Sequence, residues 1–105
     1  MTMLVGCQSL PEKVGLKNLA DSDPLVRLSA IKWAGENKIT DAVEPLVDCL
    51  EDDDASIRFF AIQALVKITG QDHGYDYKTD ARSRCEAIEQ WRRVLSETTT
   101  AHQIE

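Results

Sequence analysis

Residues 19–31 read LADSDPLVRLSAI, and residues 50–62 read LEDDDASIRFFAI. The second stretch follows the first at an offset of 31 residues, and both carry Leu, two Asp, an aliphatic residue, Arg, Ala and Ile in register. A fixed offset with matching residues predicts a helical repeat rather than one irregular domain. Repeat units of this kind stack on their neighbours and present an extended surface.

Capping residues place the ends of two helices in these units. Asp23-Pro24 is typical of a helix start, because the Asp side chain accepts backbone N–H bonds and proline fits the first turn. Asp54 stands at the same place in the second unit. Gly35 and Gly70 are the expected ends of the two helices, because glycine readily adopts the left-handed conformation that closes a helix.

One domain is therefore expected over residues 11–96, followed by a flexible tail over residues 97–105. Asp41 with Glu44 three residues later is typical of a capping box. Asp80 is the expected cap of the last helix, which would cover the open end of the stack. The expected helices span residues 11–20, 24–34, 41–51, 55–68 and 81–96.

The composition describes a small acidic domain. The chain has 105 residues and a formal net charge of −6, with 43% hydrophobic and 29% charged residues, which is ordinary for a globular protein. The negative charge argues against nucleic-acid binding, which needs a dense cationic face. No apolar run approaches the length of a membrane-spanning helix.

The sequence carries no motif for catalysis, a metal or a cofactor, so we expect none of these. Cys7, Cys49 and Cys85 share no metal-ligand spacing, and an odd number cannot form a closed disulfide framework. Cys49 and Cys85 fall on apolar faces of expected helices and are expected to be plain buried thiols. Asp72 and His73 lie in a polar loop whose acids do not follow the spacing of a calcium loop. No nucleophile–base pair or phosphate loop occurs.

The pattern Leu-x-Asp-x-Asp-x-x-Val-Arg-x-x-Ala resembles HEAT repeats, and most of all the short variety named after the phycobilisome lyases. The resemblance covers residues 11–70, and the segment 69–76 with Trp91-Arg92 resembles the endings of small bacterial HEAT domains. It implies an all-α, right-handed α-solenoid of antiparallel helix pairs with a C-terminal capping helix. Nothing matches a bilin pocket, so the lyase activity is not implied.

Four cations are candidates for a partner-binding face. The resemblance implies that the second helix of each unit lines the inner face of the solenoid, and these two helices carry Arg27, Lys32, Arg58 and Lys67. Such a mildly basic groove would bind an acidic segment of another protein. The alternative, which we favour for Arg27 and Arg58, is that each guanidinium bonds to the Asp-rich turns.

The first residues offer a separate hypothesis about location. Residues 4–7, Leu-Val-Gly-Cys, resemble a bacterial lipobox, in which Cys7 would be acylated and residues 1–10 would be a tether or signal remnant. Only six residues precede Cys7, without a basic region or a full apolar region. As written, the chain is expected to be cytoplasmic. The alternative, if a longer precursor exists, is a membrane-anchored periplasmic or extracytoplasmic lipoprotein held only by lipid on Cys7.

The predicted function is protein–protein interaction or scaffolding without catalysis. Two alternatives remain open at this point. The chain could be an accessory or regulatory subunit of an enzyme, including chromophore-lyase-like systems. It could also be a self-associating structural module, since about two units plus a cap is short for an array that usually needs at least three, and a weak homo-oligomer would supply the missing contacts.

Overall fold

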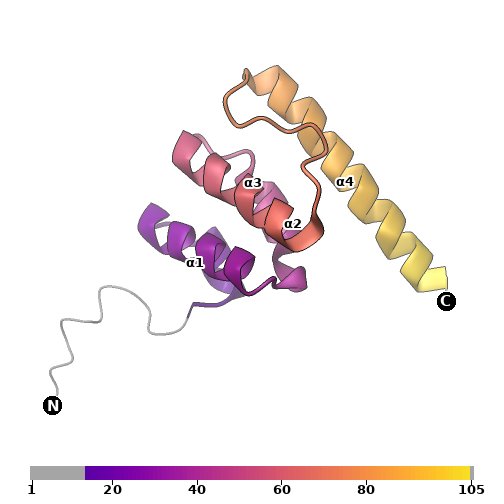
Figure 1. Cartoon of the computed structure of the whole chain (residues 1–105), viewed down its shortest axis with the longest axis horizontal. Helices are drawn as coiled ribbons and strands as arrows, with labels where there is room; N and C mark the ends of the chain where they lie inside the picture. Colours follow the sequence, from indigo (N-terminus) through magenta and orange to yellow (C-terminus); the bar gives the residue numbers. More distant parts are fainter. Residues whose placement is uncertain (1–13, 105) are drawn as a thin grey trace, which may run out of the picture.

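The computed structural model describes residues 14–104, and every regular element in this range is helical (Figure 1). The prediction of an all-α fold is confirmed. Residues 1–10, and with them the lipobox-like segment and Cys7, lie outside the described residues. The elements are the 3-10 helices η2 (Leu16–Ala20) and η3 (Thr40–Ala42) and the α-helices α1 (Pro24–Glu36), α2 (Val43–Cys49), α3 (Ala55–Thr69) and α4 (Ala81–Ile104).

The helices form two rows. α1 and α3 lie side by side in one row, and η2, α2 and α4 form the other, in which α2 contacts both of its neighbours. Each unit pairs a first helix with a second one, η2 with α1 and α2 with α3. Because each unit packs mainly on the next, the fold is a short α-solenoid.

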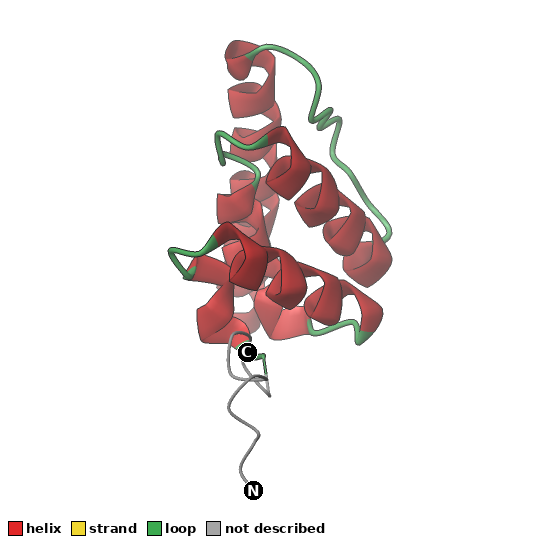
Figure 2. Ribbon diagram, turned by 90° about the vertical axis from the view of Figure 1, so that its left-hand side faces the viewer, coloured by secondary structure: helices red, strands yellow, loops and turns green. Residues whose placement is uncertain are grey.

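α4 closes the second row as a cap rather than as the start of a third unit. The beginning of α4 lies beside Leu50, and Leu95 lies beside Val43, so α4 runs antiparallel to α2. The long loop before it runs back beside the helices, as Figure 2 shows. This reversal places α4 on the flank of α2 and leaves α3 as the last helix of its own row.

The predicted helix starts are confirmed at three aspartates. The Asp23 carboxylate accepts a hydrogen bond from the Leu25 N–H, and Asp54 accepts one from the Ser56 N–H. Asp80 accepts one from the Ser83 N–H at 2.8 Å. Hydrogen bonding from Ser83 holds the pKa of Asp80 below its usual value. Each carboxylate thereby satisfies a donor that the first helical turn leaves free.

The end of α1 differs from the prediction, whereas the end of α3 agrees with it. Gly70 closes α3 in the left-handed conformation, with φ of 80°. Gly35 does not stop α1, which continues through Glu36 to a cap at Asn37. Gly35 is instead buried inside the helix, where an added Cβ would lie 2.9 Å from the Cα and Cβ of Ala64. The glycine therefore permits close packing of α1 on α3.

The two first helices are shorter than predicted. The expected helix over residues 11–20 is represented in the described range by η2, whose start uses the Asn18 side chain to accept the Gly15 N–H. The expected helix over residues 41–51 divides into η3 and α2, and neither has a side-chain cap. The capping box of Asp41 and Glu44 is thus wrong. Pro45 explains the division, because it has no N–H to donate to the Asp41 carbonyl.

The last helix is longer than predicted. α4 continues to Ile104, although the sequence pattern predicted its end at residue 96 and a flexible tail over residues 97–105. The segment from Glu97 onward contains neither Gly nor Pro, so it lacks the residues that stop a helix.

The core lies between the two rows and draws on all four α-helices. Burial of one large aliphatic or aromatic side chain stabilises the fold by about 1.5–3 kcal/mol. The largest fully buried side chains are Trp91, Ile31, Leu46, Leu50, Ile57, Leu65 and Val47.

In the described part of the chain no helix combines the length and apolar character needed to cross a membrane.

The two described cysteines have opposite environments. Cys49 is buried, as predicted, and its Sγ lies 3.6 Å from the Leu19 carbonyl oxygen. The pKa of the Cys49 thiol is raised to about 11, mainly by burial and to a smaller extent by the charge of Asp52, while Arg27 opposes the shift. Cys85 is exposed, so its prediction as a buried thiol is wrong. The face of α4 that packs inward is formed by Ala87, Ile88 and Trp91 instead.

Candidate partner-binding face

Arg58 belongs to the internal structure of the solenoid. The residue is only 8% exposed. Its Nη1 donates to the carbonyl oxygens of Asp52 at 2.8 Å and Asp53 at 3.0 Å. Its Nε and Nη2 donate to the Tyr77 carbonyl oxygen at 3.3 and 3.2 Å. Arg58 therefore ties its own turn to the loop that precedes α4, and its guanidinium does not face a partner.

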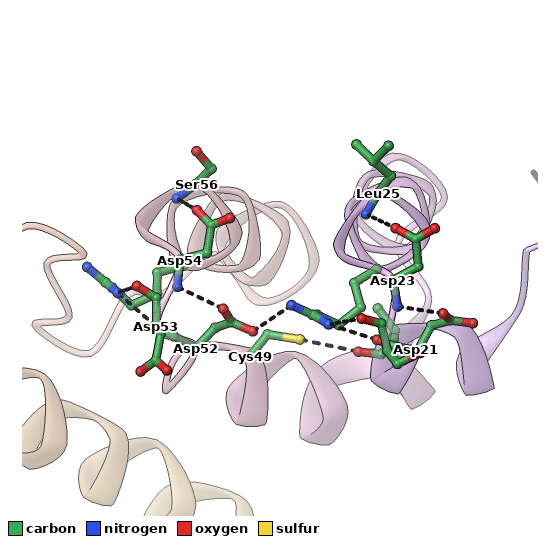
Figure 3. A network of polar contacts seen from close by, with 12 residues as sticks. Asp21, Asp23, Leu25, Cys49, Asp52, Asp53, Asp54 and Ser56 are labelled. Atoms are coloured by element: carbon green, nitrogen blue, oxygen red, sulfur yellow. Dashed lines mark hydrogen bonds and ion pairs between the residues drawn. The ribbon is translucent and has the colours of Figure 1, made fainter.

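Arg27 makes the equivalent connection from the first unit to the second. Its Nη1 donates to the Asp21 carbonyl oxygen at 2.8 Å. Its Nη2 pairs with the Asp52 carboxylate at 3.0 Å, and both side chains are about one-fifth exposed. Figure 3 shows Asp52 between the two turns. The structural alternative for the two arginines is confirmed, so they leave the set of candidate contact residues.

The Asp-rich turns explain where much of the acidic charge is used. Asp21 accepts the Asp23 N–H at 2.8 Å, and Asp52 accepts the Asp54 N–H at the same distance. Together with the two caps, the same short network is repeated in both units (Figure 3). These acids organise the chain reversals, because side-chain acceptors satisfy the free backbone donors of the turn.

Lys32 and Lys67 remain as the exposed cations of the predicted inner face. The Lys32 ammonium lies 5.8 Å from the centre of the half-buried Phe60 ring, which is a cation–π distance. Among the described residues, neither lysine forms an ion pair; the recorded pairs involve only Arg27, Arg82 and Arg92. Two unpaired cations thus flank an aromatic side chain on the exposed side of α1 and α3.

Two adjoining depressions give this surface its shape. The seam between α1 and α3 holds a shallow groove of about 20 Å³ beside Gly35 and Ala64. On the other side of α3 lies a larger hollow of about 400 Å³, whose walls are mostly apolar. We call the exposed surface between them the α1–α3 face. Its residues are Lys32, Phe60, Gln63, Val66 and Lys67.

The sequence pattern did not assign Phe60, Gln63 or Val66 to a binding surface. A signal for Val66 exists in the apolar spacing of α3, which carries one stripe for the core and a second on another flank. Val66 is 41% exposed because no described helix packs closely on that side of α3, where the loop residues Asp72 and Tyr75 cover the surface only in part. The apolar stripe was therefore visible in the sequence, whereas the exposure of Val66 was not.

The loop after α3 is held against the rest of the fold by hydrogen bonds and aromatic packing. The Tyr75 hydroxyl donates to the Leu50 carbonyl oxygen at 2.8 Å, and burial raises the pKa of this tyrosine. The Trp91 indole donates to the Asp72 carbonyl oxygen, and His73 packs edge-on against the Trp91 ring at 4.4 Å. In residues 14–104 no three His, Cys, Asp or Glu side chains converge as metal ligands.

α4 is fastened to α2 by a pair of ion pairs. The two Nη atoms of Arg92 each lie 2.9 Å from a carboxylate, one from Asp48 and one from Glu51. These contacts keep two acids of α2 and its C-terminal turn occupied by the cap. These two acids and the α1–α3 face therefore lie on different parts of the solenoid.

Comparison with known proteins gives one match. A family model described as HEAT repeats matches residues 14–90, which is most of the chain. No curated protein and no solved structure matches the chain. The prediction of a HEAT-like repeat protein is confirmed by the family match.

Proposed function

We propose a function for this chain that starts from its membership of the HEAT-repeat family. In this proposal the chain is a non-catalytic module that binds another protein through its α1–α3 face. HEAT repeats generally mediate protein–protein interaction, and the proposal adds a place on this chain and a chemistry for the partner. One observation carries the proposal: among the described residues, Lys32 and Lys67 have no ion-pair partners, and they lie beside the half-buried Phe60 and the exposed Val66.

The charge of the face points to an acidic partner segment. The chain as a whole carries −6, so two cations set apart from the acids of α2 form a local contrast in potential. Such complementarity guides encounter and orientation more than it adds affinity. The partner segment would place carboxylates near Lys32 and Lys67 and an apolar side chain over Phe60 or Val66.

The experiment compares capture of binding proteins by the native chain and by a charge-reversal variant, K32E/K67E. The matched control is Arg82→Glu, because Arg82 is 90% exposed on α4 and its reversal changes a cation to an anion on another part of the molecule. Proteins crosslinked to the native chain and identified by mass spectrometry are then tested as purified partners.

The expected result is about tenfold weaker binding of a purified partner to K32E/K67E at low salt, or about 1.4 kcal/mol. The difference should shrink in high salt, because exposed charges are screened. The Arg82→Glu chain should bind like the native chain. Equal binding by all three proteins would place the contact elsewhere and reject the α1–α3 face.

A further inference from the structure

The large hollow beside α3 occupies the position of a missing neighbour. At the seam, α1 presents Ile31, Lys32 and Gly35 toward α3. The repeat offset of 31 residues carries these positions to Ile62, Gln63 and Val66. All three of these residues line the hollow. The surface that α3 covers on α1 is therefore present a second time on α3 itself, where no described helix covers it. The loop residues Asp72 and Tyr75 form one wall of the hollow, and Val66 stays 41% exposed inside it.

On the opposite surface of the same row, no further inner helix lies beside α1 within residues 14–104. α3 packs on α1 with Phe60, Ala64 and Lys67. The same offset carries these positions back to Ser29, Trp33 and Glu36 on α1. Ser29 and Trp33 are partly buried and Glu36 is exposed. The α1 side of the internal contact is therefore repeated on the outer surface of α3, and the α3 side is repeated on the outer surface of α1.

We propose that a second copy of this chain docks head to tail, with its α1 packed on α3 of the first copy in the place of a third inner helix. The proposal goes beyond the binding of a foreign protein. The contact repeats the internal packing, with Ser29, Trp33 and Glu36 of the second copy in the roles that Phe60, Ala64 and Lys67 have inside the chain.

Shape supports this occupant. Inside the chain, Ala64 fills the seam against Gly35 and leaves only about 20 Å³. At the open end Val66 replaces Gly35, and the hollow beside it measures about 400 Å³. An incoming helix cannot approach Val66 as closely as α3 approaches Gly35. The larger side chain of Trp33, in place of Ala64, suits the wider gap, and Tyr75 supplies an aromatic wall.

Charge supports the same orientation. Lys67 lies at the rim of the hollow, and Glu36 is its counterpart by the repeat offset. In the docked pair Glu36 of the second copy comes beside Val66 and Lys67 of the first. Asp72 also lines the hollow, but its carboxylate accepts the Gly74 N–H at 2.8 Å. Head-to-tail docking therefore pairs Glu36 with Lys67, whereas two identical ends facing each other would pair like charges.

The interface is heterologous, because different surfaces meet. Such a contact leaves a free end on each side, so association continues beyond the dimer unless the assembly closes into a ring. The contact surface is essentially one helix face, well below the area of a stable complex, so the association is weak and visible only at high concentration.

The test is the mass in solution of the native chain and five variants, measured by sedimentation equilibrium over a wide concentration range. Val66→Glu introduces a charge into the hollow, and Glu36→Lys and Lys67→Glu each create a like-charged pair. The double variant E36K/K67E restores opposite charges. Leu25→Glu is the matched control for Val66→Glu, because Leu25 is 65% exposed and lies outside both contact sets.

The expected result is a native average mass that rises with concentration past the dimer. The Val66→Glu, Glu36→Lys and Lys67→Glu chains stay monomeric, while E36K/K67E and Leu25→Glu associate like the native chain. A native monomer at every concentration, a limit at the dimer, or failure of E36K/K67E to recover would overturn the proposal. A monomeric native chain would leave binding of a foreign protein through Lys32 and Lys67 unaffected, so the two proposals fail separately.

Discussion

The two repeat units bind an equivalent arginine to different neighbouring segments. Arg27 and Arg58 hold equivalent positions, and each donates to the backbone of its own turn. Beyond that turn, Arg27 reaches the Asp52 carboxylate of the next unit, whereas Arg58 reaches the Tyr77 carbonyl oxygen of a loop. Beside the last unit lies the loop before α4, which offers the neutral Tyr77 carbonyl oxygen in place of a carboxylate, and Arg58 is more deeply buried than Arg27.

The same residue type at equivalent repeat positions therefore contributes differently to the free energy of unfolding, depending on the segment packed next to it. Arg27 bridges two turns at the partly exposed edge of the stack, where water can replace a lost contact. Arg58 is buried, and its removal leaves several carbonyl groups without a donor. Unsatisfied buried acceptors cost more than the hydrogen bonds themselves contribute.

The largest expected effect comes from Arg58→Ala. We expect a loss of about 3 kcal/mol in the free energy of unfolding, because the carbonyl oxygens of Asp52, Asp53 and Tyr77 lose the buried guanidinium as their donor. Urea unfolding followed by circular dichroism measures this change. Arg82→Ala is the control, since the Arg82 side chain is 90% exposed, and should change stability by less than about 0.5 kcal/mol. Equal effects of the two substitutions would contradict the structural role of Arg58.

The next contrast concerns Gly35 and Val66, which also occupy equivalent positions. Gly35→Ala introduces a methyl group 2.9 Å from Ala64, which must move. Overpacking of this kind costs about 1–3 kcal/mol, and the better helix propensity of alanine returns about 1 kcal/mol. We therefore expect a net loss of about 1 kcal/mol in thermal or urea unfolding.

Val66→Ala is the matched substitution at the open end and should change the stability of the monomer by about 0.5 kcal/mol or less. The sign for Gly35→Ala decides the interpretation. A stabilising alanine would mean that helix propensity dominates and that the seam can widen without cost.

These positions also show where sequence reasoning succeeds. Asp23, Asp54 and Gly70 were predicted correctly, because a cap depends on local backbone chemistry that the residue type determines. The prediction that Gly35 ends α1 was wrong, because a glycine that allows close packing looks the same in sequence as one that ends a helix. The difference lies in Ala64, which is distant in the chain and close only in the fold.

The candidate site was predictable to a similar degree. The sequence identified all four cations of the two second helices, and it favoured the internal role of Arg27 and Arg58 from their Asp-rich neighbours. It could not place Val66 on the surface, because the apolar stripe of α3 is the same whether or not a helix covers it. Exposure there depends on the reversed direction of α4, which no local pattern encodes.

A smaller effect is expected from the ion pair that joins the two units. In a double-mutant cycle of Arg27→Ala and Asp52→Asn, we expect a coupling energy of about 1 kcal/mol, because both side chains are about one-fifth exposed and water screens the pair. Asn is chosen because it retains an oxygen that can accept the Asp54 N–H. Urea unfolding of the four chains measures the coupling. Strictly additive effects would mean that Arg27 acts only within its own turn.

The two units also differ at Cys49, whose counterpart in the first unit is Asn18. We expect ionisation of the Cys49 thiol to have no effect on stability at neutral pH. Burial raises the thiol pKa from 9.0 to about 11, so the folded chain keeps a proton that the unfolded chain loses in between. The corresponding stability is fully present below pH 9 and is lost as the pH rises toward 11.

Unfolding measured across this range should show a downward slope that is smaller in Cys49→Ala. At neutral pH the native chain should react with iodoacetamide at Cys85, which is exposed, well before Cys49, since only an accessible thiolate attacks. Peptide mass analysis separates these sites from Cys7. Rapid native labelling of Cys49 would mean that the junction between the units opens readily, and the contrast between a rigid internal seam and an open outer end would then fail.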